Sequence, residues 1–536
     1  MKRRKFAALA AGLTALALML TACGGGQTPA TASPSAPASP STGASASPSA
    51  AAYKDTLNIA ITAQPPNLDA PTSSSNAAAG IAMHIFESLF SLDGDYKPVP
   101  VLAESYTVSD DGLVYTIKLR QGVKFHNGKD LTAEDVVASM NRWLEASAKA
   151  KALLGGSVFA EVDDHTVTLT VPKAASDILE ILANPAQFAA VSPKEIVEAA
   201  GPDGITEYIG TGPYRLAEWK ADQYIHLVRY DDYQSPPGAS SGFSGEKQAA
   251  TENLYFRFVT DHATRIAGIQ TGEYDVAEAV PLERYEELAG DTGLTLYTKS
   301  SGNLNLFLNT AQGPLVNEKL RQAVLAALND ADILLASFGN ESLYTLNPSF
   351  ANPSQAQWAV ESGAEYYNQN DPEKAKALLA EAGYNGETIR LVTTPDYEEM
   401  YKATLVVQEQ LRQVGFTAEV ESYDFAVFME HRSDPAQWEL FITSNSYGLN
   451  PSQFSVLNPA WAAFDRPEVA EGIEGIRYAS SADEATEAWR GLQQFIYEYG
   501  AASVLGQYSS VVATHNTVKH FDFFQYPVYW NVTVAQ

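Results

Sequence analysis

A serine in a glycine-rich pentapeptide is the first candidate for chemistry in this chain. Gly238-Ala-Ser-Ser-Gly242 matches the G-x-S-x-G pattern of the nucleophile elbow, in which a strand precedes the serine and a helix follows it. Here Pro236-Pro237 precedes the pattern and Phe243-Ser-Gly245 follows it, which is the composition of a loop. We therefore expect no catalytic residue here and no enzymatic activity; a secreted hydrolase is the alternative.

Metal and cofactor chemistry is the second possibility. The chain has eight histidines and one cysteine, and the closest histidine pair, His515 and His520, has a spacing that fits neither a helix face nor a strand face. His84 and His126 are interpreted as packing or hydrogen-bonding residues. No Walker A, HExxH or CxxC pattern is present. We expect no cofactor and no bare-metal site, while binding of a metal chelate or haem stays open.

Polar loops that follow apolar strands are better candidates, because ligands of open α/β sheets bind beyond the carboxyl ends of the strands. Loops 64–67, 394–397 and 444–447 offer amides, hydroxyls and an aromatic face, the mixture of an uncharged polar pocket. The helix start after 394–397 also suits an anion. Turn chemistry alone would explain the same residues. The candidate ligand-binding residues are Gln64, Pro66, Asn67, Asp396, Tyr397, Ser444, Asn445, Ser446 and Tyr447.

The helices around these loops have clear start and stop signals. Thr132-Ala-Glu-Asp135 is a capping-box pattern that opens a helix through Leu144. Asp371-Pro372 gives an N-cap followed by proline at the first helical position, and Gly383 ends that helix. These signals predict a chain rich in helices.

Strands alternate with helices in the C-terminal half. Residues 389–393 and 416–420 are typical of strands, and residues 398–414 between them are typical of a helix. A strand, a helix and a strand in succession form a βαβ unit, so we expect its two strands to be parallel. Residues 440–443 predict a further strand. The pattern indicates an α/β protein.

The amino terminus has the pattern of an export signal. Lys2-Arg-Arg-Lys5 is basic, and residues 6–20 form an apolar stretch too short to read as a membrane span. It ends in Leu20-Thr-Ala-Cys23, which resembles the lipobox of bacterial lipoproteins. The resemblance implies a signal peptide of residues 1–22 and a lipid on Cys23, which anchors the protein to the outer face of the cytoplasmic membrane. An ordinary signal peptide with an incidental cysteine is the alternative.

Composition separates a tether from a large folded part. Residues 24–52 are Gly-, Ser-, Ala-, Pro- and Thr-rich without charge, so we expect residues 23–52 to be the lipidated cysteine and a disordered tether. The rest of the chain exceeds what one core supports, which predicts two or more lobes. A net charge of −29 argues against nucleic acid and against an anionic membrane face as partners.

Four sequence blocks resemble the peptide/nickel-type (family 5) extracellular solute-binding proteins of ABC importers, the relatives of oligopeptide- and dipeptide-binding proteins. They occur in the family's order and extend over nearly all of the mature chain. The blocks are PVLAESYTVSDDGLVYTIKLRQGVKFHNGKDLTAEDVVASMNRW (100–143), GTGPYRLAEW (210–219), LNTAQGPLVNEKLRQAVLAAL (308–328) and DPEKAKALLAEAGY (371–384).

The resemblance implies a two-lobed α/β periplasmic-binding-protein-like fold (type II, cluster C-like) with an extra subdomain. Lobe I would be built from residues 53–82, 207–302 and 504–536, the subdomain from 83–206 and lobe II from 303–503. The chain would cross between the lobes near Gly302 and near residues 500–506, where glycines suit hinges. The protein would be a monomer that closes on a small solute and delivers it to the membrane subunits of an ABC permease.

One residue departs from the family pattern. Peptide binders carry an aspartate in the late loop that pairs with the α-amino group of the peptide, and Tyr447 falls at about that position. No acidic residue lies between Glu439 and Asp465, although a buried ammonium needs a countercharge. We expect a ligand without a buried α-amine: a modified or blocked peptide, a glycoside or another polar metabolite.

Overall fold

The computed structural model describes residues 53–73, 75–201, 204–457 and 464–536. The predicted signal peptide, Cys23 and the tether up to residue 52 lie outside the described residues, so these expectations stay predictions. Within the described ranges, no helix combines the length and the apolar character that a membrane crossing requires.

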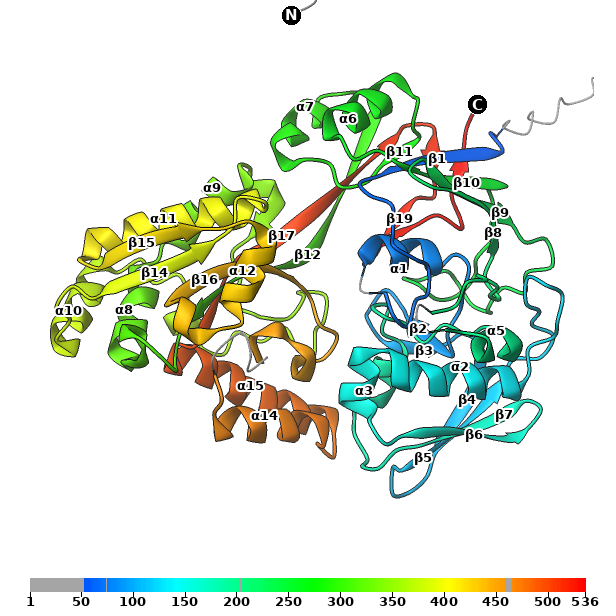
Figure 1. The fold of residues 1–536 in the computed structure, drawn as a ribbon, viewed down its shortest axis with the longest axis horizontal. Helices are drawn as coiled ribbons and strands as arrows, with labels where there is room; N and C mark the ends of the chain where they lie inside the picture. Colours follow the sequence, from blue (N-terminus) through cyan, green and yellow to red (C-terminus); the bar gives the residue numbers. More distant parts are fainter. Residues whose placement is uncertain (1–52, 74, 202–203, 458–463) are drawn as a thin grey trace, which may run out of the picture. The chain divides into compact units, whose positions relative to one another are not determined.

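The largest sheet of the described residues runs through the whole folded part and contains eleven strands (Figure 1). In strand order it contains β15 (Thr417–Ser422), β14 (Thr388–Thr393), β16 (Leu440–Ser446), β12 (Leu294–Leu308), β17 (Ala502–His515), β11 (Val276–Ala277), β1 (Thr56–Ile61), β10 (Asn253–Phe258), β9 (Tyr224–Arg229) and β8 (Tyr214–Lys220). Strand β13 (Tyr344–Thr345) pairs with β17. At its centre, β12 (Leu294–Leu308) and β17 (Ala502–His515) pair along most of their length in antiparallel register. Two hydrophobic cores lie along this sheet, one built mainly from residues 57–256 and 512–534 and the other from 266–513.

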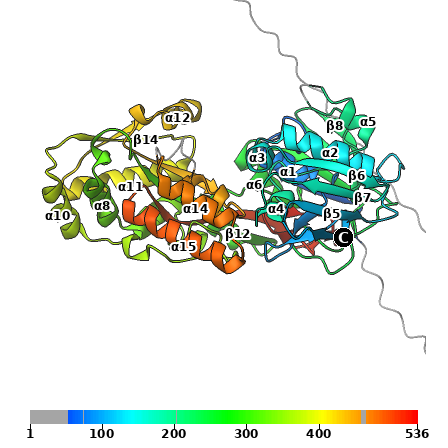
Figure 2. The same ribbon diagram turned by 90° about the horizontal axis from the view of Figure 1, so that it is seen from below.

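We call the elements that pack on the first core the first lobe, and those that pack on the second core the second lobe. Figure 2 shows the lobes side by side with β12 at their junction. The two-lobed α/β fold is therefore confirmed. The segment boundaries predicted for lobe I, the subdomain and lobe II stay predictions.

Strand β12, which passes from one lobe to the other, contains a glycine at a close contact with a neighbouring strand. The β12–β17 register shifts between Ser300 and Gly302 and again between Leu304 and Asn305. A Cβ atom on Gly302 would lie 2.1 Å from the Asn445 carbonyl oxygen. The absence of a side chain at Gly302 thus lets β12 and β16 (Leu440–Ser446) pair closely at the lobe junction.

The second lobe contains the predicted βαβ unit. Strand β14 (Thr388–Thr393) and strand β15 (Thr417–Ser422) are parallel, and helix α11 (Glu398–Val414) connects them. Helix α10 (Pro372–Ala382) begins at the Asp371 cap and ends at Gly383, which has a left-handed φ of 69°. The sequence predictions for these elements are confirmed. Helices α8 (Glu318–Ala327), α9 (Asp330–Phe338), α12 (Phe425–Arg432), α14 (Pro467–Arg477) and α15 (Ala482–Tyr499) also belong to this lobe.

The first lobe has a sheet of its own besides the large one. Four antiparallel strands follow the order β4 (Ala103–Val108), β5 (Val114–Leu119), β7 (Thr166–Thr170) and β6 (Val158–Asp163). Helix α2 (Ala133–Ala146) packs on this sheet and buries Val136, Met140 and Trp143 on one stripe. The stripe is the one that its sequence predicts. The rest of the lobe is built on β1 (Thr56–Ile61), β8 (Tyr214–Lys220), β9 (Tyr224–Arg229) and β10 (Asn253–Phe258).

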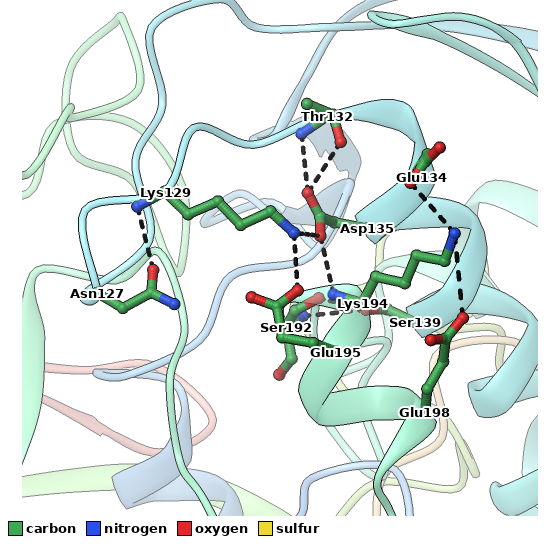
Figure 3. A network of polar contacts seen from close by, with 10 residues as sticks. All are labelled: Asn127, Lys129, Thr132, Glu134, Asp135, Ser139, Ser192, Lys194, Glu195 and Glu198. Carbon is green, nitrogen blue, oxygen red and sulfur yellow. Dashed lines mark hydrogen bonds and ion pairs between the residues drawn. The ribbon is translucent and has the colours of Figure 1, made fainter.

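A buried carboxylate fixes the start of α2, as Figure 3 shows. Asp135 Oδ2 accepts hydrogen bonds from the Thr132 amide and hydroxyl at 3.1 and 3.0 Å. Its Oδ1 accepts from the Lys194 amide at 2.8 Å and from Lys129 Nζ at 2.6 Å. The predicted capping box is confirmed. These bonds hold the α2 N-terminus to the loop before it and to α5 (Lys194–Glu198).

Candidate ligand-binding site

A cavity of about 260 Å³ lies between the lobes. Its walls come from both sides of the junction and from the crossing strands, so no single lobe encloses it. Aromatic rings and small polar groups dominate its surface. The aromatic and amide residues are Tyr96, Tyr447, Tyr508, Phe523, Phe524, Tyr526, Asn76, Asn184, Asn352 and Gln525, and the serines are Ser300, Ser301, Ser446 and Ser510.

Several wall residues are held by hydrogen bonds to one another. The Tyr447 hydroxyl lies 2.7 Å from the Ser300 hydroxyl, and Asn352 Nδ2 donates to the Tyr96 hydroxyl at 2.9 Å. Burial raises the pKa of Tyr96 to about 12 and that of Tyr447 further. Both phenols are thus neutral at physiological pH, and the wall they form is preorganised.

Only one charged residue is found among the described residues that line this cavity, and it is a cation. Lys149 is half-buried in the first turn of helix α3 (Ala148–Leu154). Its Nζ forms no hydrogen bond or ion pair with a described residue, and burial lowers its pKa to about 8. No Asp or Glu of the described residues lines the cavity.

A second cavity of about 240 Å³ adjoins the first, and five residues line both. Glu278 contributes a carboxyl group to the second cavity, where its Oε1 accepts a hydrogen bond from the Tyr529 hydroxyl at 2.7 Å. Burial raises the pKa of Glu278 to about 7, so this group is only partly ionised near neutral pH and is a weak countercharge. The shared residues are Asn76, Ser510, Phe523, Gln525 and Tyr526.

Direct polar contacts join the lobes close to the cavity. Arg477 of α14 donates to both carboxylate oxygens of Asp177, at 2.9 and 3.3 Å, and to the Leu153 carbonyl at 3.0 Å. Asp177 is fully buried. The two lobes are therefore in direct contact on this side of the cavity. The further pairs are Asn352–Tyr96, Asn450–Glu180 and Asn184–Gln453.

Comparison with known proteins places this architecture. The model of bacterial extracellular solute-binding proteins, family 5 Middle, matches residues 97–466, more than half of the chain. The glutathione-binding protein GsiB of Salmonella typhi is 32% identical over 476 residues, covering 83% of this chain and 88% of that protein. The chain is a family 5 solute-binding protein. The family that its four sequence blocks resemble is thereby confirmed.

Two further relatives agree with this assignment. A protein of Sinorhizobium fredii, the probable peptide ABC transporter periplasmic-binding protein y4tO, is 27% identical, covering 85% of this chain and 89% of its own. The ABC transporter substrate-binding protein CtaP of Listeria monocytogenes has the same fold, with a TM-score of 0.77 at 24% identity over 87% of this chain and 95% of its own. This family 5 protein is thus the extracytoplasmic substrate-binding component of an ABC transporter.

The structure brings part of the predicted 444–447 loop into the cavity. Ser446 and Tyr447 line the first cavity of this family 5 protein. Ser444 donates instead to Glu399 at 2.8 Å, and Asn445 accepts from Asn305 Nδ2 at 3.0 Å. Only the last two residues of the loop therefore face the space between the lobes.

The 394–397 loop lies elsewhere in the second lobe. Asp396 Oδ2 accepts a hydrogen bond from the Phe425 amide at 2.8 Å, and the exposed Tyr397 packs its ring on that of Phe425. Glu398 and Glu399 occupy the first turn of α11. These carboxylates already interact favourably with the helix N-terminus and would repel an added anion.

The 64–67 loop packs on β8 and β9 and does not line the first cavity. Gln64 Oε1 accepts a hydrogen bond from the Asp222 amide at 2.7 Å, and Asn67 Oδ1 accepts from the Asp69 amide at 3.1 Å. Pro66 is exposed. These contacts are turn and packing chemistry, and a ligand contact for Gln64, Pro66 and Asn67 stays a prediction.

Most residues of the cavity wall were not predicted from the sequence. Lys149 belongs to a helix with no motif, and Asn352 belongs to an irregular segment that no strand rule selects. The C-terminal run Phe523-Phe-Gln-Tyr526 could have been identified from the sequence, because it contains three aromatic residues in four positions.

The other residues that the sequence suggested for catalysis or metal binding are held in place by structural contacts. No helix or strand begins between β9 and β10, so Ser240 lacks the strand and helix of a nucleophile elbow, and its hydroxyl accepts a hydrogen bond from Asn531 at 3.2 Å. His84 is buried, with its ring nitrogens 2.9 Å from the Gly80 carbonyl and 3.2 Å from the Tyr529 amide. The described residues contain no cluster of His, Cys, Asp and Glu that could hold a metal ion.

Proposed function

We propose that this protein captures a small, polar, peptide-like solute that presents no free ammonium group to the late loop. The observation that carries this proposal is the cavity wall, which consists of hydroxyls, amides and aromatic rings with no Asp or Glu among the described lining residues. Tyr447 also lies at about the position where the family resemblance places the aspartate of peptide binders. An ammonium group there would lose its hydration without gaining a countercharge.

The relatives support a peptide-like ligand. One of them is named for glutathione binding and another as a probable peptide-transporter component. Closure between the lobes would follow from a ligand that touches both walls, since such a ligand binds the closed form more tightly than the open one. The closed form would then deliver the solute chemically unchanged to the permease, with no catalytic step.

Isothermal titration calorimetry with tripeptides in pairs, one free at its amino group and one N-acetylated, tests the ligand class. We expect the acetylated members to bind more tightly. Tyr447→Asp should reverse this order of affinities, because the new carboxylate provides a countercharge for the free amine. Tyr447→Asn should not reverse it, because asparagine is similar in size to aspartate but uncharged. Tight binding of the free-amine peptides to the unmodified protein would overturn the proposal.

We also propose that Cys23 carries a lipid and that residues 23–52 tether a monomer to the outer face of the cytoplasmic membrane. The basic n-region, apolar stretch and lipobox-like ending of residues 1–23 support this. Cys23→Ser should move the protein from the membrane fraction to the medium, and light scattering should give the mass of one chain. Membrane retention of the variant would contradict the lipid anchor.

A further inference from the structure

Among the described residues, Lys149 is the one cation that lines the cavity, and its ammonium group has no partner within this part of the chain. Lys149 Nζ is half-buried and forms no ion pair with a described residue, and the lowering of its pKa is caused by burial alone. An ammonium group that has lost water without gaining a countercharge is unfavourable by itself. In a binding protein, the missing countercharge can come from the ligand.

A second lysine strengthens the positive potential of this cavity. Lys299 of β12 places its Nζ 5.4 Å from the ring centroid of Phe524, which lines the cavity. Among the described residues, Glu278 has the only carboxyl group that lines the adjoining cavity, and its pKa of about 7 leaves it partly neutral. The charge that lines the first cavity among the described residues is therefore positive, although the whole chain carries a net charge of −29.

An exposed lysine on the same helix provides a comparison for Lys149. Lys151 is two residues further along α3, is exposed, and pairs with Glu145 at 3.7 Å. The α3 N-cap, where Ser147 accepts from the Ala150 amide at 3.1 Å, fixes the backbone on which Lys149 is presented. The two lysines thus share a helix and differ in whether they face the cavity and in whether they are paired.

We propose that Lys149 binds a carboxylate of the captured solute, so that the transported ligands are acids. This inference rests on the proposed function, because it assigns a charge to the ligand of the same cavity. A carboxylate suits the site since lysine provides three donors on a single charge and the neighbouring serine hydroxyls and asparagine amides can donate to the remaining lone pairs.

The test uses N-acetylated tripeptides in matched pairs, each as the free acid and as the C-terminal amide, titrated calorimetrically into the purified protein. We expect the acids to bind and Lys149→Met to weaken their binding about 10- to 100-fold, as loss of one charge-assisted hydrogen bond implies. Binding of the amides should change little. Lys149→Arg should retain part of the affinity, and Lys151→Met, the matched control on the same helix, should leave it unchanged.

The possible failures are distinguishable. Equal binding of acids and amides to the unmodified protein would overturn the role of Lys149 and leave the proposed ligand class standing. Binding of free-amine peptides alone would overturn the proposed function and this inference with it. Native mass spectrometry of protein purified without refolding gives an independent readout, in which a retained neutral or cationic solute would also contradict the assignment.

Discussion

The hydroxyls of Tyr447 and Tyr96 have hydrogen-bond partners in the cavity wall, whereas the Lys149 ammonium has none among the described residues. At the scale of single residues, the site thus combines a preorganised neutral surface with one unsatisfied charge. The neutral surface provides shape and hydrogen bonds, and the charge discriminates between ligands of different charge, because burying the wrong charge is far more costly than losing a neutral contact.

The pKa of Lys149 makes the binding of acids depend on pH. Since burial lowers this pKa to about 8, the ammonium form that attracts a carboxylate is depleted as the pH rises above that value. The dissociation constant for an acid should be constant at lower pH and rise by up to about tenfold per pH unit above pH 8. Calorimetry between pH 6 and 9.5 measures this.

The neighbouring groups do not obscure this titration. Burial raises the pKa of each tyrosine of the wall, so the phenols Tyr96, Tyr447, Tyr508 and Tyr526 stay neutral in this range. Glu278, whose pKa burial raises to about 7, titrates below pH 8, so Lys149→Met should remove the rise above that pH. Persistence of the rise in that variant would assign it to another group.

At the scale of elements, the position of Lys149 depends on α2 and its cap. Helix α2 ends where Ser147 begins α3, and the Asp135 network holds the start of α2 to α5 (Figure 3). Trp143 of α2 donates its indole N–H to the Gln187 carbonyl at 2.8 Å, close to the Asn184–Ala186 wall segment. The capping network thus supports two parts of the cavity wall.

Removing the buried carboxylate should therefore destabilise this region. Asp135→Ala leaves the Thr132 and Lys194 amides without their acceptor, and we expect a loss of about 2–4 kcal/mol in the free energy of unfolding, from urea titration followed by circular dichroism. Glu134→Gln, which removes only an exposed pair with Lys194, should change it by about 0.5 kcal/mol or less. Equal effects of the two substitutions would show that the network is not a stabilising element.

At the scale of the whole folded part, two lobes share one sheet and meet again through side chains on the far side of the cavity. The shared strands β12 and β17 connect the lobes covalently, while Arg477 and Asp177 connect them through a salt bridge. Such an arrangement suits a binding protein, since a covalent connection can act as a hinge while side-chain contacts can form and break.

The Arg477–Asp177 pair should favour closure. In Arg477→Ala, the buried Asp177 loses its counterion in the closed form but could be hydrated in an open form. We expect the radius of gyration from small-angle X-ray scattering to increase and ligand affinity to fall about 10- to 100-fold. Lys376→Ala, which removes a surface pair on α10, is the control and should change neither quantity. An unchanged radius and affinity in Arg477→Ala would contradict this role.

Local sequence patterns determined the helices, the βαβ unit and the family. The caps at Thr132 and Asp371 and the alternation in 389–393 depend on residues a few positions apart, so the sequence by itself specified them. The expected departure from the peptide binders at Tyr447 rests on the sequence pattern around the late loop, and it stays a prediction.

The composition of the cavity was decided only by tertiary structure. Asn76, Lys149, Asn352 and Tyr526 line one space although some 450 positions separate the first from the last. The close approach of two strands at Gly302 also became visible only in the fold, while a hinge at this glycine stays a prediction. Short-range patterns encode backbone conformation, whereas the pairing of distant strands and the meeting of two lobes depend on packing across the whole chain, which no local window contains.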